Sequence, residues 1–275
     1  MTDHPDDDAT GARETALRAI ACLDLTNLDE GCDAPAIEAL CRRARTPAGP
    51  VAAVCVWPAF VAQAREALAG SGIRVATVVN FPRGEDTEAA VLAETARALA
   101  DGADEVDLVV PWRALVQGES GRIGDLTRAV KATCGEAPLK TILETGELRE
   151  ASLIARASRE ALGGGADFLK TSTGKVPVNA TPEAAEILLT AIKEAGRPVG
   201  FKAAGGVRTT ADAAVYLDLA ARIMGPDWPT PERFRIGASG LLDALLRTLD
   251  GDGAPGEKAK GENAGDAAES RGPRY

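Results

Sequence analysis

The chain has 275 residues and a mass of 28.4 kDa, a size that suits one large domain such as an α/β barrel of about 250 residues. Hydrophobic residues make up 45% and charged residues 26% of the chain, which is close to a globular average and excludes wholesale disorder. The formal net charge of −10 argues against a nucleic-acid ligand, because such binding needs a basic face.

The negative charge is concentrated at the two ends of the chain. Residues 1–10 contribute −4 and residues 250–275 contribute −2, so the body between them carries only −4. The overall acidity therefore does not count against an anionic substrate. We predict a flexible acidic N-terminal segment over residues 1–13, one domain over 14–249, and a flexible, Gly/Ala-rich tail over 250–275.

The cysteines and the apolar runs bear on where the protein works. The number of cysteines, five, is odd and no CxxC pair occurs, which is typical of free thiols in a reducing compartment. The N-terminus is acidic and polar, unlike a targeting peptide. The longest nearly apolar run, residues 51–62, is shorter than the ~20 residues of a membrane span. We therefore expect a cytoplasmic protein with no membrane partner.

Short apolar runs alternate along the chain with longer Ala/Leu/Glu/Arg-rich stretches of helical spacing. The runs lack two-residue alternation, which is typical of parallel strands covered on both faces. The predicted strands, eight in number, cover residues 22–25, 51–57, 75–81, 105–110, 139–144, 168–172, 199–203 and 234–238.

The stretches between these strands carry helix-end signals. Thr181 precedes a proline and a glutamate, as at a helix N-terminus, and Gly196 ends that stretch. Thr87 and Thr210 open similar helices. Such strand–helix units form either a closed barrel or an open doubly wound sheet. Because no GxGxxG follows the first strand, we predict the (β/α)8 TIM barrel.

Lysines occur inside the predicted strands, where charged residues are unusual. The chain has only eight lysines, and Lys140, Lys170 and Lys202 lie in strands. Each can be a structural, ion-paired residue. Alternatively, burial and repulsion between ammonium groups on adjacent strands lower the pKa of one lysine and free a neutral amine for Schiff-base formation.

Glycine-bearing loops follow the last three strands, at residues 171–175, 205–206 and 237–240. Glycine often only makes turns, but backbone amides in such loops of a barrel also bind phosphate. Metal chemistry has little support, because the only histidine, His4, lies in the acidic end. A Mg²⁺ site at Asp107 and Glu144 is disfavoured by the lysines predicted at the same mouth. We expect no metal and no cofactor.

Several segments closely resemble the deoxyribose-phosphate aldolase family, over about residues 14–249 and in the family's order. They are LDLTNL (23–28), GADEVDLVVPWRAL (102–115), LKTILETGEL (139–148), GADFLKTSTGKV (165–176), NATPEAA (179–185), GFKAAGGVRT (200–209) and IGASGLL (236–242). The resemblance implies a class I aldolase that reversibly cleaves 2-deoxy-D-ribose 5-phosphate to acetaldehyde and D-glyceraldehyde 3-phosphate, in deoxyribose phosphate catabolism.

The resemblance also implies roles for individual residues. Lys170 corresponds to the Schiff-base nucleophile, Lys202 to the neighbour that lowers its pKa, and Asp107 to the acid/base that moves protons with water. The implied substrate- and phosphate-binding residues are Thr171, Gly174, Lys175, Gly205, Gly206, Ser239 and Gly240. Weaker candidates are Asp24 and Thr26 at the first strand, Cys55 as a thiol exposed to aldehydes, and the C-terminal Tyr275 as a proton carrier.

The sequence departs from the family pattern at two positions. Ala203 replaces the proline of GFKPAGG, and Gly240 replaces a second serine after Ser239, which removes one hydroxyl from the phosphate site. Two other functions stay open: a metal-free sugar-phosphate isomerase with Asp107 or Glu144 as base, and a non-catalytic phosphosugar-binding protein. We expect a phosphorylated sugar and an aldehyde as ligands, and the sequence leaves a homodimer open.

Overall fold

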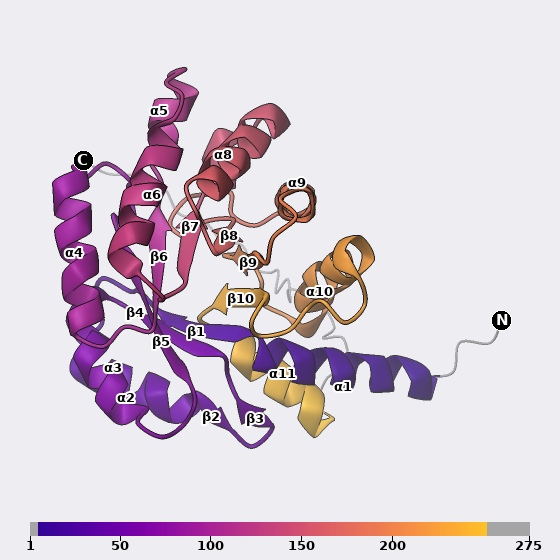
Figure 1. Ribbon diagram of the computed structural model, residues 1–275. Helices are drawn as coiled ribbons and strands as arrows, with labels where there is room; N and C mark the ends of the chain where they lie inside the picture. The colour runs from indigo at the N-terminus through magenta and orange to yellow at the C-terminus, as the bar shows by residue number, and fades with distance from the viewer. Residues whose placement is uncertain (1–4, 252–275) are drawn as a thin grey trace, which may run out of the picture.

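The computed structural model describes residues 5–251 of the chain, with side chains from residue 10 on. Parallel strands close into a barrel in the order β1-β10-β9-β8-β7-β6-β5-β4, and helices surround it (Figure 1). The barrel strands are β1 Leu23–Asn27, β4 Ala53–Val56, β5 Arg74–Val79, β6 Glu105–Val109, β7 Leu139–Ile142, β8 Phe168–Lys170, β9 Gly200–Ala204 and β10 Phe234–Ala238. The predicted TIM barrel is confirmed, and each predicted strand overlaps one of these.

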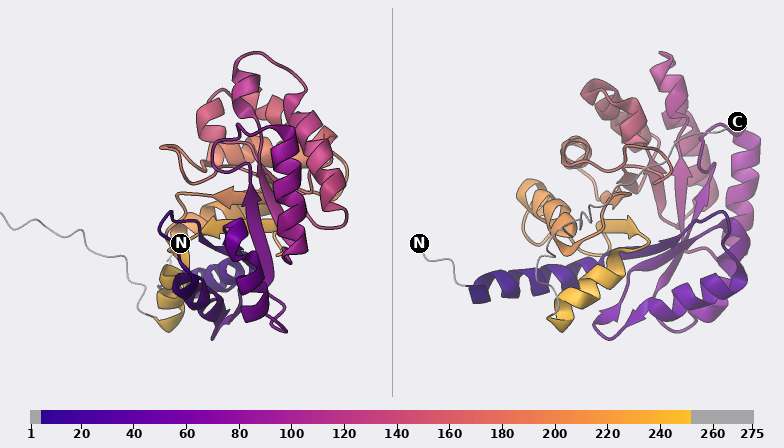
Figure 2. Two further views of the ribbon diagram at one scale, coloured as in Figure 1. Left: turned by 90° about the vertical axis from the view of Figure 1, so that its left-hand side faces the viewer. Right: turned by 180° about the vertical axis from the view of Figure 1, so that it is seen from behind.

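The helices follow the strands in the alternating order of a barrel (Figure 2). They are α1 Pro5–Ala21, α2 Ala34–Arg43, α3 Val61–Ala67, α4 Glu88–Ala100, α5 Trp112–Val116, α6 Arg122–Cys134, α7 Thr145–Leu148, α8 Ala151–Gly163, α9 Pro182–Glu194, α10 Thr210–Met224 and α11 Leu241–Asp250. Two-residue strands β2 Arg45–Thr46 and β3 Gly49–Pro50 form a hairpin, and the 3-10 helix η1 Pro58–Phe60 precedes α3; the sequence predicted none of these three.

The predicted helix starts have the expected capping contacts. The Thr181 side chain accepts a hydrogen bond from Ala184 N, and Thr87 caps α4 in the same way. Helix α10 begins at Thr210, but its cap is Thr209, which forms a capping box with Asp212. The sequence therefore located the helix correctly and missed only which threonine caps it.

Helix α1 begins at Pro5, inside the segment 1–13 for which the sequence predicted flexibility. It packs against α10 and α11. The apolar side chains of Ala16, Ala19 and Ile20 are buried, which joins this helix to the barrel's main core. The predicted tail 250–275 lies outside the described residues, apart from its first two.

One layer of side chains inside the barrel is charged. Strand register pairs Asp107 with Lys140, Lys170 with Lys202, and Lys202 with Arg235. All of these residues are at most 3% exposed. Because inward-facing residues of neighbouring strands form layers in such a barrel, the register stacks charged groups inside it, directly beneath the carboxyl ends of the strands.

Candidate active site

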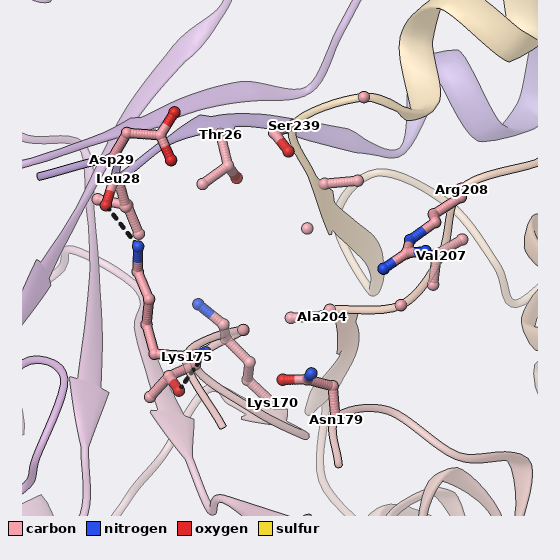
Figure 3. Close-up of a pocket in the computed structure, with 17 residues that line it drawn as sticks. Thr26, Leu28, Asp29, Lys170, Lys175, Asn179, Ala204, Val207, Arg208 and Ser239 are labelled. Carbon is pink, nitrogen blue, oxygen red and sulfur yellow. Dashed lines mark hydrogen bonds between the residues drawn. The ribbon is translucent and has the colours of Figure 1, made fainter. Parts of the chain in front are cut away.

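A cavity of about 530 Å³ opens at the carboxyl ends of β1, β8, β9 and β10 (Figure 3). This is the end at which barrel enzymes place their active sites. The predicted site residues that line it are Thr26, Lys170, Gly174, Lys175, Gly205, Gly206, Ser239 and Gly240. The fold thus brings segments from the first strand and the last three strands to one mouth.

Lys170 supplies the amine at the cavity. It ends β8, its residue is only 3% exposed, and its Nζ donates a hydrogen bond to Asp107 Oδ2 at 2.7 Å. Burial lowers the pKa of Lys170, because it disfavours the charged amine. The Asp107 carboxylate raises this pKa, and the charge of Lys202 lowers it. Together these effects place the pKa of Lys170 below the usual lysine value. A larger share of this amine is therefore neutral and able to attack a carbonyl carbon.

Lys202 and Asp107 lie beneath the cavity and do not line it. Lys202 Nζ donates to Asp107 Oδ2 at 2.8 Å and to Asp24 Oδ2 at 2.5 Å. Burial alone would lower the pKa of Lys202, but Asp107 and Asp24 raise it above the usual value. Of the two amines, Lys202 is therefore the one whose charged form is favoured, and Lys170 the one whose neutral form is favoured.

Asp107 accepts hydrogen bonds from several ammonium groups at once. Lys140 donates to its Oδ1 at 2.8 Å, and Lys170 and Lys202 share its Oδ2. Burial would raise the pKa of Asp107, but these lysines hold it well below the usual range. The carboxyl is therefore ionised, so it can accept a proton or orient water but carries no proton of its own to donate.

The glycine loops and the start of α11 form the other end of the cavity. Gly174, Gly205 and Gly206 have φ values of +82°, +80° and +86°, which glycine adopts without strain. Ser239 and Gly240 immediately precede Leu241, the first residue of α11, so free amides at that helix N-terminus face this end. These groups suit an anion such as phosphate.

Lys175 and Glu144 hold the loop that follows β8. Lys175 Nζ donates to Leu28 O, which follows β1 on another side of the mouth, at 2.8 Å. Glu144 accepts hydrogen bonds from Thr173 N at 3.1 Å and Thr173 Oγ1 at 2.6 Å. Thr173 Oγ1 in turn accepts from Lys175 N at 3.0 Å. This chain of contacts fixes the backbone from which Lys175 extends.

Three of the remaining candidates lie away from the cavity. Thr171 is fully buried, and its Oγ1 accepts from Ala204 N at 3.0 Å, which ties β8 to β9. Asp24 is buried between Lys202 and Arg235. Cys55 is fully buried on β4, and burial raises the pKa of its thiol. The structure therefore places Cys55 as a core cysteine rather than an exposed thiol. Tyr275 lies outside the described residues.

Comparison with known proteins gives the family. Residues 18–246 match the DeoC/LacD family aldolase. The chain belongs to the DeoC/LacD family of aldolases. It is 53% identical over 252 residues to the deoxyribose-phosphate aldolase of Agrobacterium fabrum (strain C58 / ATCC 33970), covering 90% of this chain and 96% of the relative.

Solved structures give the same result for the fold. The crystal structure of a putative deoxyribose-phosphate aldolase from Toxoplasma gondii ME49 superposes with a TM-score of 0.82 at 30% identity, covering 88% of this chain and 97% of that chain. The putative deoxyribose-phosphate aldolase from Coccidioides immitis superposes with a TM-score of 0.76 at 26% identity, covering 88% and 96% of the two chains. This chain is thus an aldolase on a TIM barrel.

Sequence reasoning missed several polar groups of the aldolase. Arg208 and Asn179 line the cavity, and the Arg208 guanidinium points into it (Figure 3). Glu105 and Arg235 lie in the buried polar layer. The last two had a signal in the sequence, because each is a charged residue in a mostly apolar predicted strand, the same pattern that drew attention to the lysines.

Two findings concern only the described part of the aldolase. Within residues 5–251 no group of three or more His, Cys, Asp or Glu side chains is arranged to hold a metal ion. No helix in that range is long and apolar enough to cross a membrane. The magnesium site considered at Asp107 and Glu144 has its carboxylates already engaged, by lysines and by Thr173 respectively.

Proposed function

We propose that this aldolase reversibly cleaves 2-deoxy-D-ribose 5-phosphate to acetaldehyde and D-glyceraldehyde 3-phosphate through a Schiff base on Lys170. The observation that carries the proposal is the Lys170 amine, which reaches the cavity while Lys202 beneath it stays charged. The name of the Agrobacterium fabrum relative, at 53% identity, supports the same substrate.

The chemistry begins with attack of the neutral Lys170 amine on C1 of the open-chain sugar. Loss of water gives the iminium. Removal of the proton from the C3 hydroxyl then breaks the C2–C3 bond, releases glyceraldehyde 3-phosphate and leaves its electron pair as an enamine on C1 and C2. Protonation of C2 and addition of water release acetaldehyde and restore Lys170.

The surrounding residues have separate tasks in this proposal. Lys202 keeps Lys170 deprotonated by charge repulsion, and Asp107 positions water and accepts protons. Gly174, Lys175 and the amides at the start of α11 hold the phosphate. Tyr275 stays a predicted proton carrier to C2 of the enamine; removing it should lower kcat more than it changes substrate binding.

Borohydride trapping tests the covalent step directly. Reduction in the presence of 2-deoxyribose 5-phosphate should fix a two-carbon or five-carbon adduct on Lys170, located by peptide mapping, and a coupled assay should detect acetaldehyde. EDTA should leave the rate unchanged, since no metal is required in this mechanism. Substrate conversion without an adduct or acetaldehyde would instead support a sugar-phosphate isomerase, and binding without turnover a phosphosugar-binding protein.

Two further predictions accompany this function. A cytoplasmic location is proposed from the free cysteines, which cell fractionation would test. A homodimer is also proposed. Light scattering at the assay concentration would measure the molar mass and so distinguish a dimer from a monomer.

A further inference from the structure

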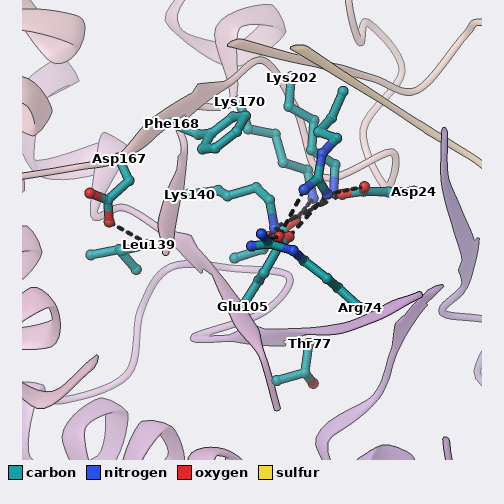
Figure 4. Close-up of polar contacts among 12 residues, drawn as sticks. Asp24, Arg74, Thr77, Glu105, Leu139, Lys140, Asp167, Phe168, Lys170 and Lys202 are labelled. Carbon is teal, nitrogen blue, oxygen red and sulfur yellow. Dashed lines mark hydrogen bonds and ion pairs between the residues drawn. The ribbon is translucent and has the colours of Figure 1, made fainter. Parts of the chain in front are cut away.

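Charged side chains meet inside the barrel and form a closed ring of alternating sign; Figure 4 shows Asp24, Lys140, Lys202 and Glu105 among them. Its members are, in order of contact, Asp24, Lys202, Asp107, Lys140, Glu105 and Arg235. Each is at most 2% exposed. The ring contains three acids and three bases, so its formal charge is zero when every member is ionised.

Short contacts join every neighbouring pair from Asp107 through Glu105 to Asp24. Lys140 Nζ lies 2.8 Å from Asp107 Oδ1 and 2.6 Å from Glu105 Oε2. Arg235 Nη2 lies 2.8 Å from Glu105 Oε1, and its Nη1 lies 2.7 Å from Asp24 Oδ1. Nη1 also donates to Glu105 Oε2 at 3.1 Å, so the guanidinium bridges the two carboxylates through both of its terminal nitrogens, a fixed fork geometry that lysine cannot reproduce.

Lys170 is attached to this ring from outside. It contacts only Asp107 Oδ2 among the ring's carboxylates, at 2.7 Å, and Lys202 already occupies the same oxygen. A proton on Lys170 would give the ring together with Lys170 a net charge of +1, with no unpaired carboxylate in the ring to balance it. Because uncompensated buried charge is costly, charge balance itself favours the neutral amine.

We infer that Glu105 and Arg235 are positioning residues for the aldolase reaction, because they close the buried ring that holds Asp24 and Asp107 in place and leaves no unpaired ring carboxylate for a proton on Lys170. The inference rests on the proposed function only in taking Lys170 as the reacting amine. Glu105 and Arg235 do not line the cavity and act through the ring.

The single substitutions below leave the other titratable or charged groups around Lys170 unchanged. Those that face it or the ring are Cys55 on β4, whose buried thiol is neutral, Arg74 on β5, Glu144 after β7, Lys175 in the loop after β8 and Arg208 in the loop after β9. Arg74 contacts Glu105 Oε1 at 3.1 Å, but its side chain is 46% exposed, so water screens its charge.

The ring predicts opposite effects for two single substitutions. Glu105→Gln removes a negative charge and should move protonation of Lys170 to lower pH, whereas Arg235→Gln removes a positive charge and should move it to higher pH. At an effective dielectric constant of about 20, a unit charge on the order of 10 Å away contributes about 1.7 kcal/mol, which changes a protonation equilibrium by at least about tenfold. The double variant restores zero charge and should return Lys170 to the wild-type protonation.

Protonation of Lys170 can be measured without substrate. Trace acetylation across a pH series, quantified on the Lys170 peptide against exposed Lys193, reports the fraction of neutral amine. The low-pH limb of kcat/KM for 2-deoxyribose 5-phosphate is the second readout. Arg74→Gln is the matched control, because it removes a contact to the same Glu105 carboxylate from outside the ring and should leave both readouts unchanged.

Opposite shifts in the two single variants, cancelled in the double variant, support the inference. Loss of activity with no shift, or shifts of the same sign, would mean a merely structural role and overturn it. If Arg235→Gln does not fold, Glu105→Gln still decides the sign, and Arg235→Lys, which keeps the charge but loses the fork, should keep the wild-type protonation of Lys170. Absence of a borohydride adduct in the wild type would refute the proposed function, while the acetylation result would still judge the ring.

Discussion

Replacing Lys202 by methionine removes the charge that faces the Lys170 amine. Both nitrogens contact Asp107 Oδ2, at 2.7 and 2.8 Å, so they lie no more than 5.5 Å apart. At that separation and an effective dielectric constant of about 20, the repulsion between two ammonium groups is about 3 kcal/mol. With about 1.4 kcal/mol for each factor of ten, this corresponds to about a hundredfold change in the neutral fraction of Lys170.

A second effect of the substitution has the same sign. Without Lys202, the Asp107 carboxylate interacts more strongly with Lys170 and stabilises its charged form. The pKa of Lys170, which burial and Lys202 now hold below its usual value, therefore rises in Lys202→Met, and the amine is protonated over more of the neutral range. We expect kcat/KM near neutral pH to fall about a hundredfold.

The assay is kcat/KM for 2-deoxyribose 5-phosphate over a pH series, with the rate of borohydride trapping as an independent readout. The low-pH limb should move to higher pH, and activity should recover at alkaline pH. Lys202→Arg, which keeps the positive charge, should retain the limb of the wild type. A Lys202→Met profile that is merely scaled down, with its low-pH limb unmoved, would refute the electrostatic reasoning.

Three further substitutions or conditions test other parts of the structure. Thr173→Val removes the hydroxyl that joins Glu144 to Lys175 N, so KM for the phosphorylated substrate should rise about tenfold while turnover of unphosphorylated deoxyribose is unaffected; equal losses on both substrates would argue against a phosphate loop. Gly205→Ala places a Cβ 2.7 Å from the Asn179 side chain at a φ of +80° and should lower the free energy of unfolding by about 1–3 kcal/mol. Gly206→Ala, with φ of +86° and open space, should cost less; equal costs of the two variants in denaturant unfolding would mean that the clash is unimportant. Burial would raise the pKa values of Asp24, Glu105 and Asp107, but their cationic partners hold them below the ordinary values of 3.8 for aspartate and 4.5 for glutamate. Their ionised forms therefore stabilise the fold at pH values above this range. The free energy of unfolding should therefore fall as the pH drops below about 4, and a flat profile from pH 6 to 3 would contradict the ion pairs.

Local patterns in the sequence were sufficient to predict the barrel. Each apolar run became a buried strand, since a run that must be covered on both faces suits a parallel sheet with helices outside. The capping threonines located α4 and α9 because an N-cap contact spans only three residues. Lys170 and the glycine loops were likewise predicted from motifs that lie within single strand–loop segments.

Only the closed barrel decided which polar residues meet. Asp24 and Arg235 are 211 positions apart in sequence, yet they share a contact of 2.7 Å because β1 and β10 close the sheet. Thr171 was predicted at the phosphate site one residue after Lys170, but it points away from the cavity and binds β9, since successive side chains of an extended segment face opposite sides. Cys55 is buried by residues from other parts of the chain, and the motif around it does not predict that contact.

The protonation of Lys170 likewise depends on contacts between residues that are remote in sequence. The sequence by itself determined that lysines would lie on neighbouring strands, and so that repulsion between them was available. Which lysine keeps its proton depends on the carboxylates that each one reaches: Lys202 has two within hydrogen-bond distance and Lys170 has one, which it shares. Strand register and barrel closure decide how many carboxylates each lysine reaches. These contacts decide the pKa, because Coulomb interactions depend on the distances between side chains.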